Sequence, residues 1–321
     1  MNVISHNSDV PIDWLTRALP LNLGAIQQIQ TIKQRPWSQV YRIQTEQGIA
    51  YFKICGPDHR QEIPLLNWLM PQPIMPDVFA LDIEQGWILM ADGGVLFREL
   101  SEPEAYHANL ATLLSNYARL QQQSLEQIGK FLAMPLPDRR LNQLPELVQQ
   151  LLNIGTQQGW LDQELFKQVL NTLPILEQLG SKLSESPYAA ALDHGDLHTG
   201  NILFKQNHLH ICDWGDACIT HPFCSLLPLV ETVMGSQYST LVPFKLMEID
   251  WVNAYLQAWH TFAPMETLKL EFQQALCIAL LLRALNIAYA IQHADVDTLT
   301  RWSPSVTNYL SQWVQVEPLV C

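Results

Sequence analysis

One short stretch of the sequence concentrates acidic, histidine and glycine residues, DHGDLHTGN at residues 193–201. The apolar triplet ILF follows at residues 202–204, and a second acidic stretch, ICDWGD, occupies residues 211–216. Between them the pattern of residues 202–212 is typical of two short strands, with a Gln-Asn turn at residues 206–207. The two acidic stretches are therefore predicted to flank a small β-hairpin.

Such a hairpin is expected to hold three oxygen-bearing side chains near one another, at loop or strand-end positions. They are Asp196, Asn201 and Asp213. Hard oxygen donors, without a thiolate or several imidazoles in the set, suit Mg²⁺. Gly195 and Gly200 allow tight backbone turns beside them. The stretch therefore predicts a magnesium site rather than a zinc site.

The composition limits the class of protein. The chain has 321 residues with 18 Lys+Arg and 31 Asp+Glu, a formal net charge of −13. Hydrophobic residues make up 48% and charged residues 15%, against about 25% charged in a typical domain. Low charge density with this hydrophobicity excludes a disordered chain. The negative balance argues against a nucleic-acid partner, because phosphates need basic surface.

Cysteines and apolar runs predict a cytoplasmic protein without a membrane partner. The six cysteines form no CxxC pair, and we expect free, mostly buried thiols. The first residues, MNVISHNSDVPIDW, have neither the basic region nor the apolar core of a signal peptide. The most apolar stretch, residues 275–291, contains Arg283 and Asn286, so a buried core helix is favoured over a membrane span.

The order of predicted elements divides the chain. Up to about residue 91 the sequence predicts three strands, one helix and two more strands, at residues 25–33, 39–45, 49–55, 58–69, 78–82 and 87–91. From residue 101 the pattern changes to long helices, at residues 102–123, 141–158, 162–183, 243–262 and 266–293. We expect a small β-rich part followed by a large helical part.

The run HGDLHTGN followed by DWGD resembles the catalytic signature of the aminoglycoside phosphotransferase / choline kinase-like family, relatives of protein kinases. Asp196 and Asn201 are five residues apart, as in the protein-kinase catalytic loop. The resemblance implies an α+β, bilobal protein kinase-like fold. The small N-terminal antiparallel β lobe with one helix would span residues 1–92, and the large, mainly helical C-terminal lobe residues 93–321.

The N-terminal half supplies a second set of matching residues. Kinases of this kind need a Lys on the third strand and a Glu on the following helix, because the pair positions the α- and β-phosphates of ATP. Lys53 lies on the third predicted strand and Glu62 nine residues later on the predicted helix. Residues 87–94 resemble the family's hinge, and the resemblance implies that backbone groups of Met90 and Ala91 contact adenine.

The sequence departs from the kinase pattern in three places. The loop expected to cover the phosphates, residues 35–41, has no glycine, and Ser38 is the candidate there for a phosphate contact. Gly195 replaces the arginine that reads a phosphorylated activation loop in protein kinases, so we expect no such switch. Ser225 stands where many family members carry Asp, at a position with a structural role.

The resemblance implies an ATP- and Mg²⁺-dependent transfer of the γ-phosphoryl group to a small hydroxylated acceptor. Asp196 would accept a hydrogen bond from the acceptor hydroxyl, and Asn201 and Asp213 would hold Mg²⁺. His194 and His198 are expected to support the loop, while Asp216 would lie near the metal or cap the loop.

Two other functions and the identity of the acceptor stay open. A nucleotide-binding pseudokinase would keep the same residues, and a metal-dependent hydrolase would use His194, Asp196, His198 and Asp213 as ligands. The resemblance implies an aminoglycoside, an amino alcohol or a sugar-like molecule as the acceptor. After residue 100 the net charge is −10, which is compatible with a cationic acceptor. Tryptophans could line a cation site, with Trp160, Trp251, Trp259 and Trp302 as candidates.

Overall fold

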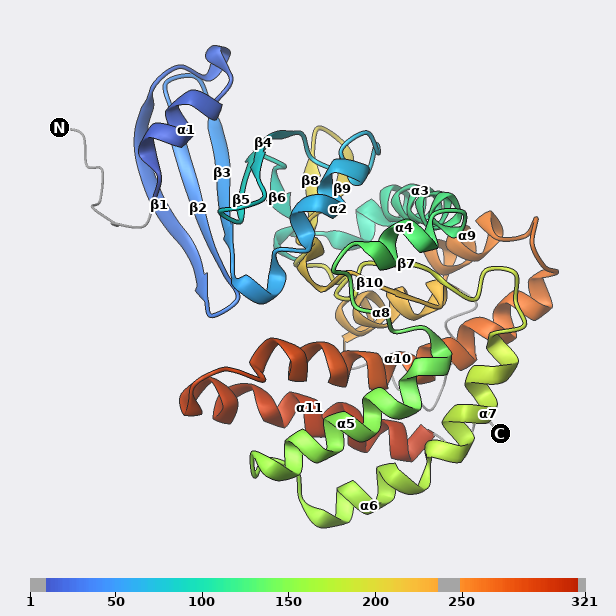
Figure 1. Ribbon diagram of the computed structural model, residues 1–321. Coiled ribbons are helices and arrows are strands. Elements are labelled where there is room, and N and C mark those ends of the chain that lie inside the picture. Colours follow the sequence, from blue (N-terminus) through green and yellow to red (C-terminus); the bar gives the residue numbers. More distant parts are fainter. Residues whose placement is uncertain (1–9, 236–248, 317–321) are drawn as a thin grey trace. The chain divides into compact units, whose positions relative to one another are not determined.

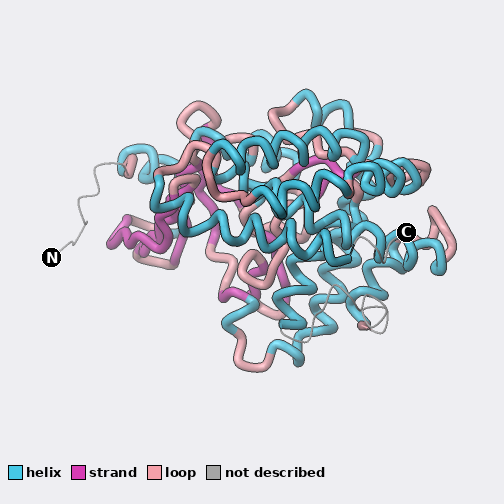
Figure 2. The backbone as a smooth tube through the Cα atoms, turned by 90° about the horizontal axis from the view of Figure 1, so that it is seen from below, coloured by secondary structure: helices cyan, strands magenta, loops and turns pink. Residues whose placement is uncertain are grey.

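A computed structural model describes residues 10–235 and 249–316 of the protein. The chain forms two compact units. The first comprises Met1–Val95 and Leu203–Gly215, and the second comprises Leu96–Ile202 and Asp216–Cys321. Strands dominate the first unit and helices the second. Figure 2 colours the strands magenta and the helices cyan. The predicted α+β class is confirmed, and the functional boundary expected at residue 92 stays a prediction.

The first unit is built on a five-stranded antiparallel sheet in the order β1-β2-β3-β5-β4 (Figure 1). Its strands are β1 Ile26–Arg35, β2 Ser38–Thr45, β3 Ile49–Cys55, β4 Val78–Asp82 and β5 Trp87–Ala91. Helix α2, Glu62–Leu69, lies between β3 and β4 in sequence, so the predicted order of elements is confirmed. A short helix, α1 Ile12–Ala18, packs Leu15 into a core with the sheet residues Tyr41, Ile43, Phe52 and Leu89.

The predicted hairpin after the first acidic stretch is also present. It consists of β8, Ile202–Lys205, and β9, His208–Ile211. Gln206 and Asn207 have φ values of 50° and 64°, which a two-residue hairpin turn requires at both central positions. The hairpin belongs to the first unit from Leu203 onward and carries the chain to Asp213.

The second unit is mostly helical. Its helices are α3 His107–Leu125, α4 Ile128–Ala133, α5 Leu144–Gln157, α6 Gln163–Asn171, α7 Leu173–Leu183, α8 Leu227–Met234, α9 Asp250–Ala258, α10 Met265–Ile291 and α11 Val296–Val316. The predicted helices are present with shifted ends, the one expected at residues 162–183 as two helices, and α4, α8 and α11 were not predicted. Two short strands, β7 Ala191–Asp193 and β10 Cys218–Thr220, pair antiparallel. The start of the helix expected at residues 243–262 lies outside the described residues.

Prolines occur at two differences from the predicted helices. The helix expected at residues 162–183 is broken at Thr172, because Pro174 lacks the N–H that a continuous helix would use. Helix α11 is not among the predicted helices, and it contains Pro304, which lacks the N–H that a continuous helix uses. It forms nonetheless, with Val306, Leu310 and Trp313 fully buried. Tertiary burial here outweighs the local cost of proline.

Helix α10 is the central apolar helix of the second unit. It is the one described helix long and apolar enough to cross a membrane, and 72% of its most apolar window is buried. The prediction of a core helix is therefore confirmed. The described cysteines are all free, and only Cys212 is partly exposed, as expected.

Candidate active site

In the first unit a buried ammonium group lies between two carboxylates. Lys53 Nζ, on β3, is 2.6 Å from Glu62 Oε2 on α2 and 2.5 Å from Asp213 Oδ1. Glu62 uses its other oxygen to accept from Trp214 N at 3.1 Å. The side chains of Lys53 and Glu62 are only 8% and 2% exposed. The structure thus brings together three predicted residues that lie up to 160 positions apart in sequence.

The electrostatics of this group keep Lys53 charged. Burial alone lowers the pKa of Lys53, but the carboxylates of Asp213 and Glu62 outweigh it and hold the pKa well above its usual value. Burial raises the pKa of Glu62, and the nearby lysine opposes that rise. A permanently charged ammonium held by two acidic groups is suited to bind phosphate oxygens.

Sequence reasoning missed a second lysine beside this group. Lys33 Nζ, on β1, lies 3.6 Å from Asp213 Oδ2. Asp213 therefore has a cation at each carboxylate oxygen, and its side chain is 33% exposed. The strand predicted at residues 25–33 placed Lys33 in the sheet, but only the tertiary structure shows what it faces.

The other nucleotide-site candidates lie on the same sheet. Residues 35–41 form a tight hairpin rather than an open loop, because β1 ends at Arg35 and β2 begins at Ser38. Ser38 is 5% exposed, and its contact with phosphate stays a prediction. Met90 and Ala91 end β5, where Ala91 N donates to Asp77 O at 2.8 Å. The contact of Met90 and Ala91 with adenine stays a prediction.

In the second unit the stretch 193–201 forms a loop braced by its own side chains. Asp193 Oδ1 accepts from Gly195 N at 2.6 Å, His194 Nδ1 from Asp196 N at 3.2 Å, and His198 Nδ1 from Gly200 N at 2.8 Å. Each acceptor serves the N–H two residues later, the usual bracing of such turns. Both histidines thus accept hydrogen bonds from the backbone of the loop, as the supporting role expected of them requires.

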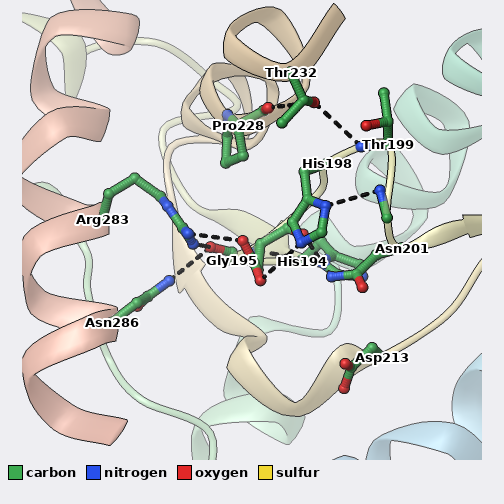
Figure 3. Close-up of polar contacts among 12 residues, drawn as sticks. His194, Gly195, His198, Thr199, Asn201, Asp213, Pro228, Thr232, Arg283 and Asn286 are labelled. Carbon is green, nitrogen blue, oxygen red and sulfur yellow. Dashed lines mark hydrogen bonds and ion pairs between the residues drawn. The ribbon is translucent and has the colours of Figure 1, made fainter. Parts of the chain in front are cut away.

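The candidate metal ligand Asn201 lies beside Asp196. Asn201 Nδ2 donates to the Asp196 carbonyl oxygen at 2.9 Å (Figure 3). The amide nitrogen is thus used within the loop, and the amide oxygen is the atom suited to a metal. Asp213 belongs to the other unit, so the expected proximity of all three oxygen donors stays a prediction.

The loop rests on buried polar side chains of the same unit. Tyr117 Oη accepts from His194 N at 3.0 Å and lies 2.8 Å from Ser225 Oγ. Gln121 Nε2 donates to the same serine hydroxyl at 3.1 Å. Ser225 is 2% exposed, and its position fits the structural role expected of it.

The Asp196 carboxylate is paired on both of its oxygens. Arg283 Nη2, on α10, lies 2.8 Å from Oδ1, and His198 Nε2 lies 3.4 Å from Oδ2. Because His198 Nδ1 accepts a backbone N–H, the neutral ring carries its proton on Nε2 and donates it toward Asp196. Burial raises the pKa of Asp196, but Arg283 and His198 overcome it and leave the pKa below its usual value.

Arg283 and Asn286 contact the loop, and the sequence did not predict these contacts. Arg283 Nη1 and Asn286 Nδ2 each donate to the Gly195 carbonyl oxygen at 2.7 Å (Figure 3). The sequence did contain a signal, since two polar residues three apart in an apolar helix share one face and need buried partners.

Comparisons with known proteins identify the family of the chain. The family described as "Phosphotransferase enzyme family" matches residues 30–270. The chain belongs to this family. The match includes every predicted site residue, from Ser38 to Asp213. A search of curated proteins found no match.

Solved structures of phosphotransferases share the fold. A choline kinase from Cryptosporidium parvum is 16% identical with a TM-score of 0.67, covering 98% of this chain and 97% of its own. An ethanolamine kinase from Plasmodium vivax is 14% identical with a TM-score of 0.59, covering 90% and 81%. An aminoglycoside phosphotransferase solved with ADP and hygromycin B is 10% identical with a TM-score of 0.58, covering 95% and 98%. These likenesses confirm the kinase-like fold.

Proposed function

We propose that this phosphotransferase moves the γ-phosphoryl group of ATP to a hydroxyl group of a small molecule. The observation that carries the proposal is the buried contact of Lys53 with Glu62 and Asp213, in a chain of this family. Lys53 binds the α- and β-phosphates, and Glu62 orients Lys53. An aminoglycoside phosphotransferase of the same fold was solved with ADP, which supports nucleotide use here.

Asp213 and Asn201 are the residues that would hold Mg²⁺. Their donor set is two hard oxygen types, and Asp213 already attracts two ammonium groups, which fits a site for a cation. When bound, the ion would neutralise charge on the ATP phosphates.

Asp196 receives the proton of the acceptor. The acceptor oxygen forms a bond to the γ-phosphorus, and the bond from that phosphorus to the β–γ bridging oxygen breaks. The electron pair of the broken bond leaves on ADP, and the hydroxyl proton moves to Asp196 and then to solvent. Because Arg283 and His198 stabilise the carboxylate, Asp196 is a weak base that takes the proton late in the transfer.

The acceptor binds to the second unit, which carries most of the negative net charge of the chain. Amino alcohols, aminoglycosides and sugar-like molecules remain the candidate classes, and the reaction is expected in the cytoplasm. Two of the suggested tryptophans are wrong for a cation site. Trp251 and Trp259 are 1% and 0% exposed, and Trp259 packs among core aromatic rings such as Tyr188 and Phe223.

The alternatives are less well supported. A hydrolase needs several converging ligands, and within residues 10–235 and 249–316 no group of three His, Cys, Asp or Glu is placed to hold a metal ion. The Nδ1 atoms of His194 and His198 instead accept backbone N–H groups. A pseudokinase has no specific observation in its favour, since Lys53, Glu62, Asp196 and Asp213 are all present.

The test is phosphoryl transfer from γ-labelled ATP with Mg²⁺ to a panel of amino alcohols, aminoglycosides and sugars. We expect one class to accept the label and Asp196→Asn to lower kcat by about 100- to 10,000-fold, with nucleotide binding retained. Nucleotide binding without transfer to any acceptor would favour the pseudokinase. Wild-type turnover in Asp196→Asn would refute the assigned role.

A further inference from the structure

Two side chains of helix α10 contact two consecutive residues, Gly195 and Asp196, of the loop at residues 193–201. Arg283 and Asn286 lie one turn apart on the same face of the helix. Arg283 donates to the Gly195 carbonyl oxygen through Nη1 and reaches Asp196 Oδ1 through Nη2, while Asn286 donates to the same carbonyl (Figure 3). The Arg283 side chain is 14% exposed. One planar guanidinium group therefore spans the main chain of one loop residue and the side chain of the next.

The two carboxylate oxygens of Asp196 have different surroundings. Oδ1 is buried and forms an ion pair with Arg283 Nη2 at 2.8 Å, without the geometry of a hydrogen bond. The whole side chain is 21% exposed, so its accessible surface does not lie on Oδ1. Oδ2 faces His198 Nε2 at 3.4 Å, longer than the roughly 2.7–2.9 Å of a strong charge-assisted hydrogen bond. Oδ2 thus retains capacity to accept another hydrogen bond.

We propose that Arg283 is a positioning residue that locks Asp196 Oδ1 to helix α10 and so presents Oδ2 to the acceptor hydroxyl. The inference rests on the proposed function. A carboxylate held at one end cannot rotate and exchange its oxygens, which keeps the proton acceptor in one place. Asn286 supports the arrangement by fixing the Gly195 carbonyl oxygen that Arg283 also binds.

The planar fork of arginine is essential to this role. Its two Nη atoms reach two acceptors at 2.7 and 2.8 Å. A lysine ammonium is a compact point charge that lacks the fork geometry. Charge alone would therefore not replace Arg283, and a lysine variant separates positioning from simple charge compensation.

The first experiment compares Arg283→Gln, Arg283→Lys and the surface control Arg119→Ala, whose guanidinium contacts the Asn116 side chain. We expect Arg283→Gln to lower kcat about 100-fold, as for a misplacement near 1 Å, with KM for ATP within about twofold. Arg283→Lys should be intermediate and Arg119→Ala unchanged. Wild-type kcat in both Arg283 variants, with Asp196→Asn inactive, would overturn the inference. Wild-type kcat in Asp196→Asn would instead overturn the proposed function.

A second experiment separates positioning from general support of the fold. In Arg283→Ala, guanidinium at low, non-denaturing concentration should restore part of kcat, whereas ammonium at the same ionic strength should not. No rescue, together with a lowered unfolding temperature, would show a merely structural residue and overturn the inference. If the Arg283 variants do not fold, Asn286→Ala carries the test. A kcat about tenfold lower at unchanged KM supports the inference, and an unchanged kcat overturns it.

Discussion

Two fully buried residues of the second unit should make the acid stability of this protein depend on pH in opposite directions. Burial lowers the pKa of His221 to about 3, from an ordinary value near 6.5. Burial raises the pKa of Asp193 to about 6, even though the Gly195 N–H and Ser225 stabilise the carboxylate. In the folded state His221 is therefore harder to protonate than in the unfolded chain, and Asp193 is easier to protonate.

The signs follow from which state binds more protons. As pH falls below about 6.5, the unfolded chain protonates His221 while the folded chain does not until about pH 3, so stability falls by about 1.4 kcal/mol per pH unit. As pH falls from about 6 to 4, the folded chain protonates Asp193 while the unfolded chain does not. This contribution to stability therefore increases as pH falls, by about 1.4 kcal/mol per pH unit. The two contributions nearly cancel in that interval.

Substitution of either residue should reveal the pH-dependent contribution of the other to the free energy of unfolding. Asp193→Asn keeps an oxygen for the Gly195 N–H but cannot titrate, and His221→Asn keeps an acceptor for Phe223 N, which lies 3.4 Å from Nδ1. From pH 6.5 to 4, the wild type should gain about 3 kcal/mol relative to Asp193→Asn. Over the same interval it should lose about 3 kcal/mol relative to His221→Asn.

Urea unfolding at pH 4, 5, 6 and 7 measures these differences, with tryptophan fluorescence and circular dichroism recorded on the same samples. Both probes must report one transition before the free energies are compared. Other groups titrate in all three proteins and cancel in the differences. Stability curves that run parallel for the wild type and both variants would refute the reasoning, as would a difference of the opposite sign.

Two further substitutions test the ion-pair group and the loop. Glu62→Gln removes one carboxylate from Lys53 and should lower kcat/KM for ATP about 10- to 100-fold, measured by initial rates at varied ATP. Gly195→Ala should destabilise the protein by more than about 2 kcal/mol in urea unfolding, because φ is +78° and a Cβ would collide with the Asp216 carbonyl oxygen. Its control is Gly159→Ala, with φ +77° and no atom near the added Cβ, which should cost only about 1–2 kcal/mol. Equal costs at the two glycines would contradict the steric argument, and an unchanged kcat/KM in Glu62→Gln would contradict the role of the ion pair.

Local patterns in the sequence were sufficient for much of the fold and for part of the site. Alternation and turn residues predicted all five strands of the main sheet, and the Gln-Asn turn predicted the hairpin at residues 202–211. Lys53 and Glu62 could be paired because a strand and the next helix carry them at short separation.

Partners far apart in sequence could not be predicted in the same way. Arg283 lies 87 residues after Asp196, and in the sequence it serves only as a charge that argues against a membrane span. The sequence around Lys33 does not predict its contact with Asp213, because a strand pattern does not reveal which side chains from other elements lie against the sheet. Helix α11 was not predicted either, because the burial that stabilises it around Pro304 is absent from any local pattern.

The path of the chain between the two compact units limits how the protein can be cut or rebuilt. The chain leaves the first unit after Val95, returns at Leu203 and leaves again after Gly215. A fragment that ends at residue 95 would retain Lys53 and Glu62 but lack Asp213 and the Trp214 N–H that Glu62 binds. A single proteolytic cut therefore cannot release the first unit intact, and a minimal version would need residues 203–215 grafted back as a second segment.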